Sequence, residues 1–255
     1  EWDDLTHFEG NANAFRLLTH QFLGRRKGGF VMTYSTLASI VKYPYSSQSA
    51  GKKSKFGFFI TEENDYRKIA DELGIKRLSK EGEPLRYARH PLVYLVEAAD
   101  DICYQMMDIE DAHKLKHLST EEAKGLYRGF FDEKKKKRAE DICRIVTDIN
   151  EQIAYLRATV IGILIHECAH VFIENEETIL EGTFEGALIK HIRSPYKEAY
   201  KRCSEVAVHK IYRSKDVLDI ELAGFNVIST LLELMIDAVQ SPDKVYSQLL
   251  INRVS

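Results

Sequence analysis

The sequence predicts an all-α protein. Apolar residues recur at steps of three and four along most of the 255 residues, as they do on one face of a helix. The alternation typical of a half-buried strand is almost absent, so few stretches can form strands. Residues that end helices, such as Gly74 and the pair Tyr43-Pro44, separate the periodic segments. These observations predict one all-helical domain over residues 1–255, with room for one small hairpin near a basic loop.

The expected helices follow one another with short connections. The first runs from about Gly10 to Leu23 and ends at Gly24, where Arg25, Arg26 and Lys27 would lie near its negative C-terminal end. The others are expected over residues 33–42, 62–73, 91–114, 120–129, 133–156 and 158–172, after Glu198, and over 220–239.

The composition is that of a globular protein without a strong charge bias. Hydrophobic residues make up 44% of the chain, charged residues 29%, and the formal net charge is −3. This balance argues against a protein that coats nucleic acid along its whole surface. The cysteines form no CxxC pair and no apolar run approaches the length of a membrane span, so we expect a cytoplasmic protein with reduced thiols and no membrane partner. The chain begins at Glu1 without an initiator methionine, and we expect it to be part of something longer.

The helix expected from Pro91 to Lys114 carries more acids than an ordinary core helix. Proline suits its first turn, and an apolar stripe then recurs at helical steps: Leu92, Leu95, Val96, Ala99, Ile102, Cys103 and Met106. Asp101 should point away from this stripe into solvent, whereas Asp100 lies at its edge, on the same side as Tyr104 and Asp108. A carboxylate that faces a cleft needs a cation, a proton or several donors. Asp100 is therefore either a hydrogen-bonded structural residue or a metal or catalytic ligand.

Two further segments carry polar residues with alternative interpretations. Asn11 lies near the start of the first helix, where an asparagine either caps the helix or contacts a ligand. The basic loop after Tyr45 and the helix end before it contribute four lysines, Lys42, Lys52, Lys53 and Lys55. These lysines either bind phosphates as point charges or are solvated. The run KKKKR at 134–138 is more typical of a solvated helix face than of a nucleic-acid patch.

An HExxH pattern lies in the apolar helical segment after residue 158, as His166-Glu167-Cys168-Ala169-His170. In a zinc protease the two histidines bind zinc from one helix face while the glutamate activates water. A third ligand would still be needed, and the nearest candidates are Glu176, Glu177, Glu181 and Glu185. A further histidine at metzincin spacing is absent. A zinc metalloprotease is therefore an alternative function, against histidines that serve only the core or an interface.

Several phrases of the sequence together resemble one enzyme family. They are HFEGNANAFRLLTH from His7, VKYPY from Val41, RHPLVYLVEAADDICYQMMDIEDA from Arg89, EGTFEGALI from Glu181 and DIELAGFNVISTLLE from Asp219. In this order they resemble the deoxynucleoside triphosphate triphosphohydrolases, the dGTPase branch of the HD superfamily. The resemblance implies an all-helical HD domain with additional helices. It also implies hydrolysis of a dNTP, dGTP in particular, to the deoxynucleoside and inorganic triphosphate.

The resemblance also implies roles for individual residues. Asp100 matches an acidic ligand of a divalent metal, Mn²⁺ or Mg²⁺. The residues that match substrate contacts are Asn11, Lys42 and Tyr43 on the phosphate side, Tyr104 and Asp108 at the sugar, Glu221 near the base and sugar, and Arg253 as an arginine supplied to the site. Members of this family usually assemble as hexamers, and some respond to single-stranded DNA or nucleotide effectors. The resemblance therefore implies a homo-oligomer that binds a dNTP.

One part of the family pattern is missing from this chain. The 255 residues contain no His-Asp dipeptide and no GHxGE-like segment, which supplies the family's catalytic histidine and glutamate. Both belong upstream of the FEGNA phrase, so we expect them before Glu1. The HD domain would then be incomplete at both ends of this chain, and Asp100 would be one ligand of a site completed elsewhere. A non-catalytic nucleotide-binding relative without the dyad is a further alternative.

Overall fold

The computed structural model describes residues 4, 6–20, 29–50 and 54–254, and this part of the chain is all-α, as predicted. Its α-helices are α2 (Gly10–Thr19), α3 (Tyr34–Ile40), α4 (Glu63–Glu72), α5 (Pro91–Lys114), α6 (Thr120–Arg128), α7 (Glu133–Ile145), α8 (Ile149–Glu174), α9 (Glu176–Leu180), α10 (Tyr196–Val206), α11 (Lys215–Gln240) and α12 (Val245–Val254). Short 3₁₀ helices occur at Ser47–Ser49, Ile60–Glu62 and Leu188–Lys190, and the π-helical segment η4 covers Ala207–Tyr212.

Isolated bridges take the place of the expected hairpin in the described part of the chain. The antiparallel bridges join Tyr45 with Arg86 and Arg77 with Tyr87, and a parallel bridge joins Ser46 with Phe58. The paired segments are too short to form a ladder. The expected extension of α2 to Leu23, the residues Gly24 to Lys27 after it, and Lys52 and Lys53 of the basic loop lie outside the described residues.

Side-chain caps set the boundaries of the long helices. The His90 side chain accepts a hydrogen bond at the start of α5, with Pro91 in the first turn. Asp148 does the same for α8, where its carboxylate accepts from the backbone N–H of Glu151 at 2.9 Å. Because Asp148 starts a new helix, the predicted single helix over 133–156 is wrong. The chain instead turns between α7 and α8.

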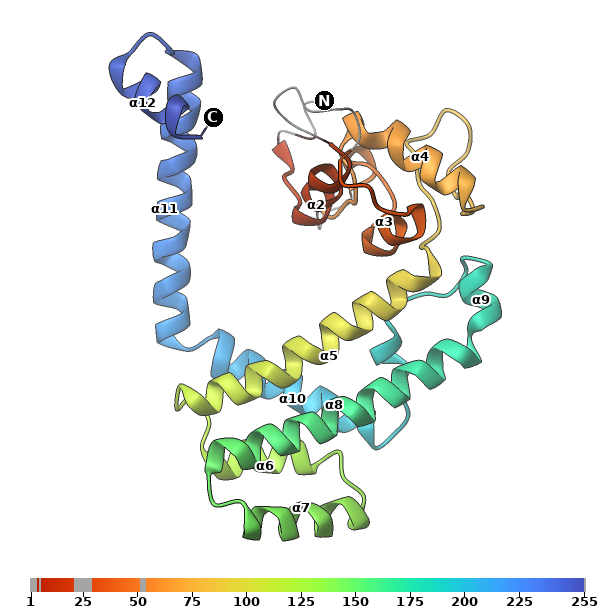
Figure 1. Ribbon diagram of the computed structural model, residues 1–255, viewed down its shortest axis with the longest axis vertical. Coiled ribbons are helices and arrows are strands. Elements are labelled where there is room, and N and C mark those ends of the chain that lie inside the picture. The colour runs from red at the N-terminus through yellow and green to blue at the C-terminus, as the bar shows by residue number, and fades with distance from the viewer. Residues whose placement is uncertain (1–3, 5, 21–28, 51–53, 255) are drawn as a thin grey trace.

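The larger core lies between α5 and α8, which run side by side in Figure 1 with α6 packed against α8. Its fully buried side chains include Ile102, Met106 and Ile109 of α5, which cluster with Ile153 and Leu164 of α8. Burial of this apolar surface holds the two helices together. The α5–α8 pair is thus the scaffold on which the other segments are placed.

The face of α5 that is buried differs from the predicted stripe. Of that stripe only Ile102 and Met106 are buried, whereas Leu92, Leu95 and Val96 are 43%, 37% and 47% exposed. The buried positions are instead Val93, Tyr94, Glu97, Ala98, Ile102, Gln105, Met106, Ile109, Glu110 and Ala112. Helix α5 therefore has two apolar faces, and α8 covers only one of them.

A second, smaller core forms the N-terminal lobe from α2, α3 and α4. Phe15, Phe58 and Tyr66 are fully buried in it, and the rings of Phe58 and Tyr66 are stacked with centroids 4.7 Å apart. Helix α3 packs against α5, which places this lobe beside the N-terminal half of α5 (Figure 1). The loop after α3 is thereby brought next to the acids of α5.

Helix α11 projects away from the rest of the protein and contacts mainly α12 (Figure 1). Only Ala238 of its residues is buried, although the helix is strongly apolar. Its most exposed large side chains are Ile220, Leu222, Phe225, Ile228 and Val239. By length and composition, α8 and α11 could each cross a membrane, which corrects the expectation that no apolar run approaches that length. For α8 the packing against α5 and α6 accounts for much of this apolar character.

Candidate functional site

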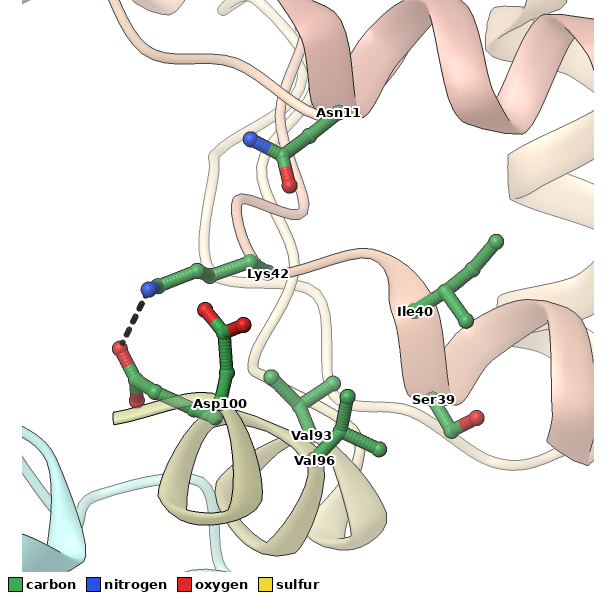
Figure 2. Close-up of a pocket in the computed structure, with 8 residues that line it drawn as sticks. Asn11, Ser39, Ile40, Lys42, Val93, Val96 and Asp100 are labelled. Atoms are coloured by element: carbon green, nitrogen blue, oxygen red, sulfur yellow. Dashed lines mark ion pairs between the residues drawn. The ribbon is translucent and has the colours of Figure 1, made fainter. Parts of the chain in front are cut away.

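Three of the predicted site residues line one cavity of about 230 Å³ between the N-terminal lobe and α5. Asn11 comes from α2, Lys42 from the loop after α3, and Asp100 from α5, as Figure 2 shows. Ser39, Ile40, Val93, Val96 and Glu97 complete the lining. Asp100 thus lies at a cavity, although the apolar stripe from which its position was predicted is not the buried face of α5.

Lys42 is held at the cavity by a buried acid. Its Nζ lies 3.1 Å from Oε1 of Glu97, whose other carboxylate oxygen lies 2.9 Å from Nη1 of Arg89 (Figure 2 marks the ion pair of Lys42). Arg89 Nε also donates to the backbone oxygen of Lys42 at 3.1 Å. Burial lowers the pKa of Lys42, but the hydrogen bond and charge of Glu97 outweigh burial and raise it. Lys42 therefore stays charged at neutral pH.

Asn11 does not cap its helix. Glu9 is the N-cap residue of α2, and its carboxylate accepts from the backbone N–H groups of Asn11 and Ala12. The Asn11 amide donates to Oε1 of Glu9 at 2.9 Å, and Lys55 Nζ lies 2.8 Å from the same oxygen. Burial raises the pKa of Glu9, but the hydrogen bonds from Lys55 and Asn11 outweigh burial and lower it. Cap duty is thus excluded for Asn11, whose side chain is oriented by Glu9.

A second cavity, of about 920 Å³, adjoins the first and shares Lys42 and Glu97 with it. Its lining includes the cationic side chains Lys42, Lys55, Arg86, Arg89 and Lys190 together with the acids Glu97 and Glu185. Tyr43 and Tyr45 lie beside one another on its wall, with ring centroids 6.2 Å apart. Such a surface suits a ligand with several negative charges and a flat ring. The predicted phosphate contact Tyr43 lies here, one residue beyond Lys42.

Tyr104 and Asp108 continue from Asp100 along the uncovered face of α5 but line neither cavity. Tyr104 is 67% exposed. Asp108 accepts a hydrogen bond from the phenolic oxygen of Tyr212, at the end of η4. Burial and this hydrogen bond raise the pKa of Tyr212 to about 12, so the phenol is a neutral donor at physiological pH.

Asp101 is not solvated as predicted. It is half-buried, and burial, followed by the charge of nearby Glu97, raises its pKa. Its backbone oxygen accepts a hydrogen bond from Tyr200 of α10 at 3.0 Å. Helix α10 packs against this side of α5, which helical periodicity alone predicts to face solvent.

Glu221 and Arg253 lie apart from the two cavities. Glu221 is on the exposed helix α11 and Arg253 near the end of α12, and neither contributes to the cavity linings. The structure therefore does not bring these two predicted residues to Asp100 within this chain.

The HExxH histidines do not form a zinc site in the described residues. Glu167, which would activate water, is buried and receives hydrogen bonds from Nε and Nη2 of Arg193 at 3.0 and 2.6 Å. His170 lies 3.0 Å from Glu174 one turn later, and His166 is exposed. These contacts are structural, so the metalloprotease alternative is not supported.

Within the described residues, Asp100 also does not belong to a complete metal site. Among the residues that the structure describes, no group of three histidine, cysteine, aspartate or glutamate side chains is arranged to hold a metal ion. Asp100 is an exposed carboxylate that shares its cavity with Lys42 and Glu97, and both oxygens of Glu97 are already paired with Lys42 and Arg89. The residues present therefore do not fit a self-sufficient divalent-metal site, and this chain offers one oxygen ligand.

Sequence reasoning missed Glu97, Arg89 and Tyr212. A signal for Glu97 was present, because it is an acid within the apolar run PLVYLVEAA, and a buried acid requires a cation. Arg89 lies just before the same helix. Helical periodicity therefore does not predict its contact with Glu97. No sequence pattern points to Tyr212 as a site residue, since a tyrosine in a loop or at a helix end is common.

No family model matches the chain. A deoxyguanosinetriphosphate triphosphohydrolase-like protein of Pseudomonas aeruginosa is 34% identical over 241 residues, which are 91% of this chain and 52% of the relative. Proteins of the same name from Synechocystis sp. and Listeria monocytogenes are each 32% identical, over 90% and 93% of this chain and 52% and 51% of the relatives. The chain thus spans about half the length of the curated relatives that it matches. It is a homologue of the deoxyguanosinetriphosphate triphosphohydrolase-like proteins over that half.

Proposed function

We propose that this chain is part of a hydrolase that cleaves dGTP or another dNTP into the deoxynucleoside and inorganic triphosphate. The observation that carries the proposal is the single cavity shared by Asn11, Lys42 and Asp100, which come from three separate segments. The names of the homologous proteins support a triphosphohydrolase of this type. The identity of the preferred nucleotide is also part of the proposal.

The cationic cavity next to Lys42 supports a triphosphate ligand. A triphosphate carries several negative charges, and the wall formed by Lys42, Lys55, Arg86, Arg89 and Lys190 can neutralise them. Two of these cations are already paired with Glu97, so they hold fixed positions before a ligand arrives. Preorganised positive charge of this kind stabilises the charge that develops on a departing triphosphate.

The uncovered face of α5 supports a role at the sugar. Tyr104 and Asp108 follow Asp100 at helical steps of four, so all three side chains lie along one side of α5. We infer that Asp108 hydrogen-bonds the deoxyribose and that Tyr104 packs where a 2′-hydroxyl would lie. Packing of the phenol ring at that position would leave no room for a 2′-hydroxyl and so would favour deoxynucleotides.

Asp100 is the proposed metal ligand of this chain. Carboxylate oxygens suit Mn²⁺ and Mg²⁺, and we infer that the remaining ligands come from a part of the protein outside these 255 residues. When bound, such a cation would supply positive charge to the phosphate oxygens. Glu221 and Arg253 are proposed to approach the base and sugar only in the completed protein.

Incubation of the full-length protein with dGTP, GTP and Mn²⁺ tests the proposal. We expect deoxyguanosine and inorganic triphosphate from dGTP, resolved by anion-exchange chromatography, and little turnover of GTP. Equal turnover of GTP, or orthophosphate as the first product, contradicts the proposal. Asp100→Asn should abolish turnover, whereas Asp243→Asn, an exposed residue between α11 and α12, serves as the matched control.

A non-catalytic nucleotide-binding protein is the second candidate. It applies if the full-length protein also lacks the His-Asp dyad, since a binding cavity can persist without catalytic ligands. This candidate predicts that the full-length protein binds dGTP at equilibrium but releases no triphosphate at any Mn²⁺ or Mg²⁺ concentration.

The assembly and location of the protein are also proposals that rest on the family. We infer a cytoplasmic homo-oligomer, a hexamer by analogy, that responds to single-stranded DNA or a nucleotide effector. Light scattering of the full-length protein measures the assembly, and activity with and without added oligonucleotide measures the response.

A further inference from the structure

Glu97 is a buried carboxylate that contacts two cations at once. It is only 9% exposed, and its two oxygens lie 3.1 Å from Lys42 Nζ and 2.9 Å from Arg89 Nη1. Burial of an acid is unfavourable unless cations compensate for the lost water. Glu97 is therefore confined to this position, and the two cations are confined with it.

Arg89 closes the cluster by binding the backbone of the same lysine. Its Nε donates to the Lys42 backbone oxygen at 3.1 Å, while its Nη1 binds Glu97. The Lys42 backbone is thus fixed by Arg89, and the Lys42 ammonium is fixed by Glu97. One loop of the N-terminal lobe and one helix of the larger core meet at this cluster.

The cluster lies at the junction of the two cavities, because Lys42 and Glu97 line both of them. Glu97 balances only one of the two cations, and the carboxylates of Asp100 and Asp101 lie nearby on α5. A long lysine side chain loses rotamer freedom when a ligand orders it. That loss is smaller for Lys42, because Glu97 already holds it in place.

We propose that Glu97 is a positioning residue for anion binding, which holds the Lys42 ammonium at the junction of the two cavities. The proposal rests on the proposed function only in taking Lys42 as a phosphate contact. It concerns binding rather than turnover, so it can be tested on the full-length protein with inorganic tripolyphosphate as the probe.

Glu97→Asp tests the proposal because it keeps the charge and withdraws the carboxylate by one methylene. We expect the dissociation constant for tripolyphosphate, measured by isothermal titration calorimetry, to rise roughly threefold to tenfold. In the Lys42→Ala background the same substitution should have no further effect. An unchanged dissociation constant, or an equal loss with and without Lys42, overturns the proposal.

Glu110 provides a matched control on the same helix. It is also buried and pairs with a lysine and an arginine, Lys114 and Arg157, at 2.7 and 2.5 Å, but it lines neither cavity. Glu110→Asp should lower the unfolding temperature much as Glu97→Asp does and leave tripolyphosphate binding unchanged. A general loss of stability would instead weaken binding in both variants, and that result contradicts a positioning role.

Glu97→Gln replaces Glu97→Asp if circular dichroism shows that the shorter side chain prevents folding. The amide keeps the length of the side chain and removes a negative charge, which by itself favours an anion. Weaker tripolyphosphate binding by this variant therefore supports positioning, and tighter or equal binding overturns it. Failure of the full-length protein to hydrolyse dGTP would count against the proposed function and leave these binding results intact.

Discussion

Tyr212 of η4 donates a hydrogen bond to the carboxylate of Asp108 on α5. The two residues are far apart in the sequence, and the π-helical segment brings the phenol to the uncovered face of α5. π-Helical segments are uncommon and often occur at functional sites. Together with Tyr200, which binds the Asp101 backbone oxygen, Tyr212 fixes the end of α10 and η4 along α5.

Tyr212→Phe should therefore impair the proposed sugar contact of Asp108. We expect the Michaelis constant of the full-length protein for dGTP to rise about fivefold, the effect of one lost hydrogen bond of about 1 kcal/mol. Steady-state kinetics measure it. Tyr246→Phe on exposed α12 is the control and should leave the Michaelis constant for dGTP unchanged. An unchanged Michaelis constant in Tyr212→Phe would contradict a role of Asp108 in substrate binding.

Arg193→Met should reduce stability by leaving Glu167 as a buried carboxylate without its cation. We expect a clear loss in the free energy of unfolding at neutral pH, measured by urea denaturation. Glu174→Gln, which removes only the exposed partner of His170, should change it by less than about 0.5 kcal/mol. Equal losses in the two variants would contradict the structural role of the Glu167 pair.

The same pair predicts a pH dependence of stability. The hydrogen bonds from Arg193 lower the pKa of Glu167 in the folded protein, although burial opposes this. A lowered pKa adds stability above the pKa of the unfolded state, and that stability is lost as pH falls through the folded-state value. The difference in unfolding free energy between wild type and Arg193→Met should therefore shrink as the pH is lowered through the usual glutamate range. A difference in unfolding free energy that stays constant as the pH falls below the usual glutamate pKa would contradict this linkage.

Zinc should not bind stoichiometrically at the HExxH pattern. His170 is paired with Glu174, and the described residues provide no group of three ligands there. We expect the zinc content after dialysis, measured by atomic emission, to be the same in wild type and in His166→Ala. One zinc per chain that is lost in His166→Ala would restore the protease alternative.

Gly57→Ala should disturb the loop that carries Tyr43. A Cβ at Gly57 would lie 2.2 Å from the Tyr43 backbone oxygen and 2.6 Å from Val41 Cγ1. Such contacts force a backbone shift, and we expect a loss of about 1–3 kcal/mol in unfolding free energy. Gly125→Ala in α6 meets no atom within 4 Å and should instead add up to about 1 kcal/mol. Urea denaturation of both variants checks the difference in sign.

Two leucines on long apolar helices should differ in their contribution to stability. Leu164→Ala on α8 removes a fully buried side chain and should cost about 2–5 kcal/mol. Leu232→Ala on α11 removes a side chain that is 55% exposed and should cost less than about 0.5 kcal/mol in the 255-residue chain. Thermal unfolding followed by circular dichroism measures both. A large loss at Leu232 would show that α11 is buried in solution.

Part of the candidate site could be predicted from the sequence. The collinear phrases and the helical spacing singled out Asn11, Lys42 and Asp100, and these three side chains share a cavity. The spacing could not show that Glu97 joins Lys42 to Arg89, because these residues come from separate segments whose approach depends on packing. The same limit applies to Tyr212 and Asp108.

The sequence by itself determined the helical class, the start of α5 at Pro91 and the family relationship of the chain. Only the tertiary structure decided which face of α5 is buried. Val96 and Ala98 both lie on apolar faces with helical spacing, yet α8 and its neighbours cover Ala98 and leave Val96 exposed. The physical reason is that periodicity reports how apolar each face is, whereas burial depends on which partner the face meets. Asp101 follows the same rule, since α10 packs beside it and burial raises its pKa.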